Sequence, residues 1–172
     1  MELSVYSDGR INTKFSGLVG KNAPYLPRLG FEYIFKKKNA SFEYFGYGPR
    51  ESYCDSMHHA SLSRFKSTAK KEYVPYIMPQ EHGNHTNTLE LIIEGIKFTP
   101  KNSMDINVSS YSANQLLEAR HLDELPENNC TFVHIDYKNS GIGSNSCGPW
   151  LIEKYQLIDK EINFEYDMEI LK

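Results

Sequence analysis

The feature that most constrains this chain is a strict alternation of apolar and polar residues near its end. Apolar side chains stand at every second position, at Ile162, Phe164, Tyr166, Met168 and Ile170. Because successive side chains of a β-strand point to opposite faces, this pattern predicts a strand with one buried and one wet face. A strand of this kind needs partners, so further sheet-forming segments are expected.

Similar but shorter alternations recur along the chain. The segments Leu29–Phe35 and Ser41–Tyr47 are predicted to pair as an antiparallel hairpin. Further strands are expected at residues 89–98, with Gly95 as a bulge, at 104–110 and at 131–137.

Two segments depart from the alternating pattern. Glu51–Lys71 has no clear period and is expected to be an irregular connection, with at most one helical turn. Ser112 and Gln115 match a capping box, which predicts one short helix at Ala113–Arg120. The fold class expected is therefore all-β, an antiparallel β-sandwich with one short helix, in a single domain over residues 1–172.

Composition excludes several classes of partner. The net charge is −3, with 19 Lys and Arg against 22 Asp and Glu, so neither nucleic acid nor an anionic membrane surface is expected to bind. No apolar run approaches the ~20 residues that a membrane helix needs. The three cysteines, Cys54, Cys130 and Cys147, form no zinc motif, and as free thiols they fit a reducing, cytoplasmic compartment.

Two blocks combine aromatic residues, turn residues and carboxylates at short range. The first runs from Tyr44 to Asp55, and the second from Tyr73 to Asn84. Tyrosine offers an apolar ring with a polar tip, so such surfaces suit carbohydrate.

These blocks also carry a family resemblance. The first block contains Gly46, Gly48, Pro49, Glu51, Tyr53 and Asp55. The second block contains Pro79, Glu81 and Gly83, and Ser109–Leu116 and Asp136–Gly143 follow in order. From about Pro27 to its end, the chain resembles the C-terminal domain of the bacterial β-galactosidases of glycoside hydrolase family 2. The resemblance implies part of a supersandwich like that of the galactose mutarotases.

The resemblance also implies where the chemistry lies. In such enzymes two catalytic glutamates lie on an upstream barrel domain, which takes ~250 residues and cannot be formed by this chain. No catalytic residue is therefore expected here, and the isolated chain is predicted to be inactive as a glycosidase. The expected partners are an upstream catalytic domain or large subunit, a β-galactoside such as lactose, and a second copy of the chain through exposed sheet edges.

Candidate contact residues come from the second block and the final strand. Glu81, His82 and Asn84 are candidates for a sugar or interdomain contact, although Glu81 equally suits the role of a loop acceptor. The family places a stacking tryptophan near the C-terminus; aligning the ends puts Met168 there, and Tyr166 is the neighbouring ring. Glu51 is expected to fix its loop, and Gly141 and Gly143 to form a scaffold turn. No metal site and no cofactor are expected on this chain, and Mg or Na ions are expected for the parent enzyme.

A different class stays open. A free-standing carbohydrate-binding or aldose-1-epimerase-like domain would need an acid and a base that converge on one sugar, and His134 with Glu81 is the pair available.

Overall fold

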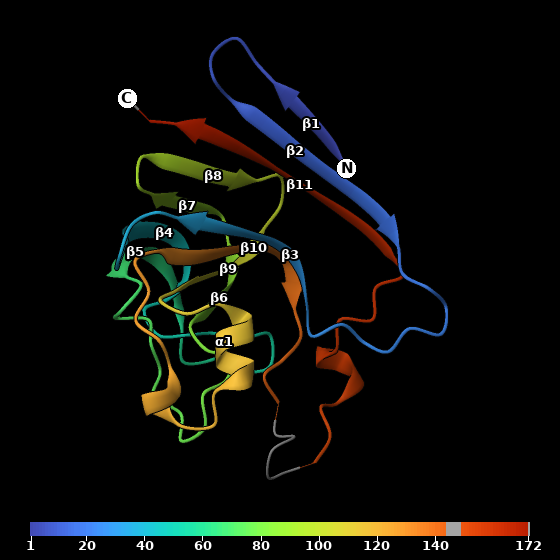
Figure 1. The fold of residues 1–172 in the computed structure, drawn as a ribbon. Coiled ribbons are helices and arrows are strands. Elements are labelled where there is room, and N and C mark those ends of the chain that lie inside the picture. Colours follow the sequence, from blue (N-terminus) through green and yellow to red (C-terminus); the bar gives the residue numbers. More distant parts are fainter. Residues whose placement is uncertain (144–148, 172) are drawn as a thin grey trace.

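The computed structural model describes residues 1–143 and 149–171 as two antiparallel sheets packed face to face (Figure 1). The larger sheet has seven strands in the pairing order β1 (Glu2–Val5), β2 (Ile11–Leu18), β11 (Glu161–Ile170), β8 (Ile96–Pro100), β7 (Glu90–Ile93), β4 (Ser41–Gly48) and β5 (Ser61–Thr68). The smaller sheet has four strands in the order β3 (Arg28–Phe35), β10 (Thr131–Asn139), β9 (Met104–Ser109) and β6 (Asn84–Thr88). The predicted all-β antiparallel sandwich is confirmed.

The alternation near the chain end forms β11, as predicted. Ile162, Phe164 and Tyr166 are buried, while Asn163 on the other face is exposed. β11 lies inside the larger sheet, between β2 and β8, so both of its edges are hydrogen bonded. One face on the core and one face toward solvent explain why its apolar–polar pattern is the clearest in the sequence.

The core lies between the sheets and is rich in aromatic rings. Phe31 of β3 meets Phe15 of β2 edge-on, with ring centroids 6.0 Å apart. Tyr33 of β3 and Tyr166 of β11 bring their hydroxyl groups to 2.5 Å. These contacts place β3 above the part of the large sheet formed by β2, β11 and β8.

Three predicted elements are wrong in their pairing or extent. Residues 29–35 and 41–47 are strands, but β3 pairs with β10 while β4 pairs with β5 and β7, so they form no hairpin. Residues 89–98 form two strands, because Glu94 and Gly95 both have positive φ and close a tight turn between β7 and β8. Residues 51–71 include β5, an edge strand whose largely polar residues show no apolar alternation.

The short helix is confirmed as α1 (Ala113–Glu118), slightly shorter than predicted. The Ser112 side chain accepts the Gln115 N–H, and the Gln115 side chain accepts the Ser112 N–H, which completes the capping box. Two single-turn 3₁₀ helices, η1 (Leu122–Glu124) and η2 (Glu153–Tyr155), lie in the connections.

Candidate functional site

The two conspicuous blocks of the sequence meet at the outer side of the smaller sheet. The Glu51 carboxylate accepts hydrogen bonds from the Gly83 N–H at 2.7 Å and from the Tyr76 hydroxyl at 2.5 Å. Ser52 donates its N–H to the Asn84 carbonyl at 2.6 Å, and the Asn84 side chain returns a bond to the Ser52 carbonyl at 2.9 Å. Glu51 thus fixes one block against the other.

Glu81 is held by Arg28, a residue that no sequence motif indicated. Arg28 donates to Glu81 at 2.9 Å through one nitrogen and to Asp136 through two others, with Nε at 3.1 Å. Tyr53 and Asn107 donate to the second oxygen of Glu81 at 3.5 and 3.3 Å. The Asp136 side chain is 1% exposed and that of Glu81 is 33% exposed, so the cluster runs from the interior to the surface.

Burial sets the protonation behaviour of this cluster. Burial raises the pKa of Asp136 to about 6, against the opposing effect of Arg28. Burial also raises the pKa of Glu81, again opposed by the nearby guanidinium. The Arg28 guanidinium therefore forms ion pairs with two carboxylates in a weakly solvated place.

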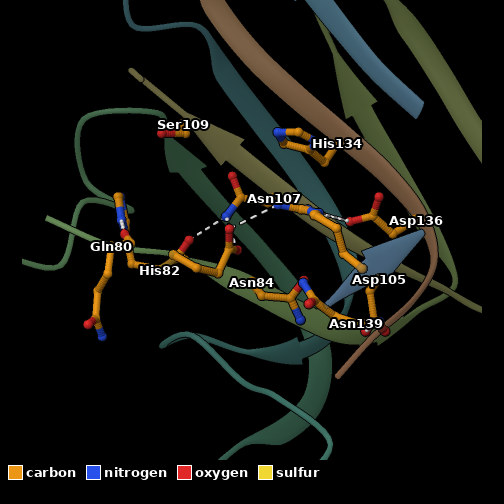
Figure 2. A network of polar contacts seen from close by, with 12 residues as sticks. Gln80, His82, Asn84, Asp105, Asn107, Ser109, His134, Asp136 and Asn139 are labelled. Carbon is orange, nitrogen blue, oxygen red and sulfur yellow. Dashed lines mark hydrogen bonds and ion pairs between the residues drawn. The ribbon is translucent and has the colours of Figure 1, made fainter. Parts of the chain in front are cut away.

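Asn107 joins this cluster to the second block. Figure 2 shows Asn107 at the centre of the network, between His82 and Asp136, with Asn84 below it. Its amide donates to the His82 carbonyl as well as to Glu81. His82 is buried, its Nδ1 donates to the Gln80 carbonyl at 2.8 Å, and burial lowers its pKa, so the ring is neutral at pH 7.

His134 and Glu81 do not form a pair. The nearest carboxylate to His134 is Glu32 on the neighbouring strand, at 3.3 Å from Nε2. Burial, with a smaller effect from Arg28, lowers the pKa of His134 to about 3, so the imidazole is neutral at pH 7 and this contact is not an ion pair. Arg28 is the ionic partner of Glu81.

Asp55 supports the glycine-containing turn after β10. Its carboxylate accepts the N–H groups of Ile142 and Gly143 at 3.2 and 2.9 Å. A Cβ atom on Gly141 would lie 2.5 Å from the Asp55 carboxyl carbon, so a larger residue there would displace this carboxylate. Cys147 belongs to residues 144–148, outside the part of the chain that the structure describes.

The glycines of the first block permit close approach of β4 to β6 of the smaller sheet at Gly46, and to β5 of its own sheet at Gly48. A Cβ atom on Gly46 would lie 2.6 Å from the Thr88 hydroxyl, and one on Gly48 would lie 3.0 Å from the Phe65 ring. A cis peptide bond joins Gly48 to Pro49 and turns the chain out of β4.

Tyr166 and Met168 lie away from the Glu81 cluster. Tyr166 is 1% exposed, among the rings of Phe31, Phe98 and Phe164, and has no free face for a sugar. Met168 is half-buried against the core. The structure therefore brings together Glu51, Tyr53, Glu81, His82 and Asn84, but not the two residues of the final strand.

Two expectations concern absences. Among the described residues, no three His, Cys, Asp or Glu side chains gather as a metal site, and Glu81 and Asp136 both form ion pairs with Arg28. The expectation of Mg or Na ions for the parent enzyme stays a prediction. No helix in residues 1–143 and 149–171 has the length and hydropathy to cross a membrane.

Comparison with known proteins identifies the family. Residues 1–170 match the model of the β-galactosidase small chain. The chain is 38% identical to a β-galactosidase of Actinobacillus pleuropneumoniae over 95% of its length, and 36% identical to one of Staphylococcus xylosus over 97%. It spans only 16% and 17% of those two proteins, about one sixth of each. The chain therefore belongs to the β-galactosidase small-chain family.

Proposed function

We propose that this chain forms one wall of the active-site cleft of a β-galactosidase that hydrolyses terminal β-galactosides such as lactose. The catalytic glutamates would lie on an upstream barrel domain or a large subunit. Family membership and the small share of each relative that the chain spans support this division of labour.

The observation that carries the proposal is an apolar face left uncovered on the larger sheet. Leu3, Val5 and Ile170 are 56%, 75% and 71% exposed. Leu3 stands opposite Thr13, which stands opposite the buried Tyr166, so these side chains continue the core-facing side of the sheet. We call Leu3, Val5 and Ile170 the uncovered face.

The smaller sheet ends beside this face. β3 pairs with β10 on one side only, so its other edge presents unpaired backbone groups. Because β3 packs above β2 through Phe31 and Phe15, a strand added to its free edge would extend over β1 and β2. A partner segment of this kind satisfies the edge and buries the uncovered face together.

A chimera tests the proposal. The segment of the Actinobacillus relative that matches this chain is replaced by the chain itself, and turnover of a chromogenic galactoside is measured. Turnover is expected in the chimera and is expected to be absent from both the isolated chain and the relative lacking the segment. Enzyme-like turnover by the isolated chain, or full activity without the segment, would contradict the proposal.

A point substitution makes the chimera more specific. Val5→Lys places a charge on the uncovered face and is expected to reduce turnover, because it weakens the contact between this segment and the rest of the chimera. Leu18→Lys is the control: Leu18 is 83% exposed, but it stands opposite Glu161 on the other side of the sheet. Equal loss in both variants would contradict a role for this face.

The carbohydrate-binding or aldose-1-epimerase alternative is supported by one observation. Glu81 and Glu32 are 33% and 35% exposed, and they lie beside Arg28 and His134 on one sheet face. Titration of galactose by NMR tests binding, and the rate of anomer interconversion tests epimerase activity. We also propose a cytoplasmic location, which the free thiols of Cys54 and Cys130 support.

A further inference from the structure

A large cavity in the described part of the chain lies away from the Glu81 ion pair. It has a volume of about 1080 Å³ and opens between the end of β10, the start of β11 and the segment around η2. Arg28, Glu81 and Asn107 are absent from its walls, and Asp105 is one of its lining residues. Ligand pockets usually measure roughly 300–1,000 Å³, so this cleft has room for more than one sugar ring.

The charges of the cleft balance. Its cationic side chains are Lys14, Lys101, Lys138 and Lys154. Its acidic side chains are Asp105, Asp159, Glu153 and Glu165. Several of these groups already neutralise each other, with Lys138 at 2.6 Å from Asp159 and Lys101 at 3.2 Å from Glu165. A cleft without net charge has no electrostatic preference for a phosphate or a cation, which favours a neutral ligand.

The walls carry both aromatic rings and hydrogen-bonded polar groups. Tyr137 is half-buried, meets Phe164 edge-on at 6.1 Å, and donates its hydroxyl to Asp159 at 3.1 Å. This hydrogen bond holds both the ring and the carboxylate in place. Tyr155 adds a second half-buried ring, and Asn163 is an exposed amide at the same cleft.

We propose that this cleft binds a neutral saccharide of two or more units. The Lys138 and Lys154 amines lie over one face of Tyr137 and Tyr155, at 4.9 and 5.0 Å from the ring centroids, so the apolar faces of sugar rings would pack on the opposite face of each ring. Sugar hydroxyl groups would bond to the Asp159 carboxylate and the Asn163 amide. The balance of lysines and carboxylates gives the cleft no net attraction for a charged ligand. The cleft includes neither the uncovered face nor the Glu81 cluster, and its sugar binding can be measured on this chain alone, so it does not rest on the proposed function.

The test is an NMR titration of the full chain with lactose, with a galactose-terminated trisaccharide and with inorganic phosphate. Saturable shifts are expected at Tyr137 and Asn163 with both sugars, and the trisaccharide is expected to bind more tightly. Asn163→Ala and Asp159→Ala are each expected to weaken sugar binding about tenfold, which equals 1.4 kcal/mol. Tyr137→Phe keeps the ring and its packing, and is expected to weaken binding less.

Matched controls are available on the surface. Asn22→Ala and Asp123→Ala change the same residue types at exposed positions outside the cleft and are expected to leave the affinity unchanged. Three results would overturn the proposal: no saturable shift with either sugar, equal affinity in the cleft variants, or shifts confined to the Glu81 cluster. Saturable binding of phosphate would overturn the assignment to a neutral ligand.

Discussion

At the scale of single residues, Arg28 is the cation on which the candidate site depends. It connects a carboxylate that is almost fully buried, Asp136, with one at the surface, Glu81. A buried ion pair contributes little net stability, but removal of one partner leaves an uncompensated charge. Mutation of Arg28 should therefore lower the free energy of unfolding by far more than the loss of its hydrogen bonds alone would.

Arg28→Met is expected to lower the free energy of unfolding at pH 7 by about 3 kcal/mol, as measured by urea denaturation. The loss should shrink at pH 5, because Asp136 then takes up a proton. Arg64→Met is the control, since Arg64 pairs with Glu43 and Glu90 at the surface and should contribute less than about 1 kcal/mol. Similar losses in both variants would show that Asp136 is compensated in another way.

Asp105 leads to a prediction about pH. It is buried, accepts hydrogen bonds from Thr86, Asn87 and Asn139, and has its pKa raised by burial from 3.8 to about 6. The folded state thus binds this proton more tightly than the unfolded state, so the contribution of Asp105 to stability falls as pH rises from about 4 to 6. The fall amounts to at most about 3 kcal/mol.

Asp105→Asn should make the free energy of unfolding less dependent on pH within that window, even if the variant is less stable overall. His134 changes stability in the opposite sense, because its lowered pKa favours the folded state as pH rises. Since His134 is present in both proteins, the difference in slope between the variant and the wild type reports on Asp105. The exposed Asp123→Asn variant should keep the wild-type slope. An unchanged slope in Asp105→Asn would mean that this carboxyl titrates normally.

At the scale of elements, the turn between β7 and β8 shows what a glycine contributes. Gly95 has φ +78°, and a Cβ atom there would meet nothing within 4 Å, so only backbone strain opposes another residue. Gly95→Ala is expected to cost about 1 kcal/mol in chemical denaturation. Gly20→Ala also meets nothing but lacks a positive φ, and should be neutral or slightly stabilising. A neutral Gly95→Ala would argue against this turn.

Elements with a local signal were predictable, and those set by distant contacts were not. The alternation of β11 and the capping box of α1 lie within a few consecutive residues. β5 is an edge strand with polar residues on both faces, so its pairing with β4 leaves no apolar pattern. At the site, the two blocks were visible in the sequence, but Arg28 was not, because its partner Asp136 is 108 residues away.

At the scale of the whole molecule, the two sheets differ in width, and the wider one exposes apolar side chains. The isolated chain is therefore expected to self-associate at high concentration, as measured by light scattering. Val5→Lys on the uncovered face should reduce the association, while Leu18→Lys on the opposite side should affect it less. A strictly monomeric wild-type chain would contradict this expectation and weaken the argument for a partner at that face.

The position of β11 has a consequence for the order in which the molecule is assembled. The hairpin of β1 and β2 belongs to the beginning of this chain, yet it joins the larger sheet only through a strand made about 140 residues later. Until β11 is synthesised, the hairpin has no neighbouring strand in the sheet and cannot complete its pairing. Premature termination shortly before residue 161 would therefore remove β11 and also leave the β1–β2 hairpin without a neighbouring strand.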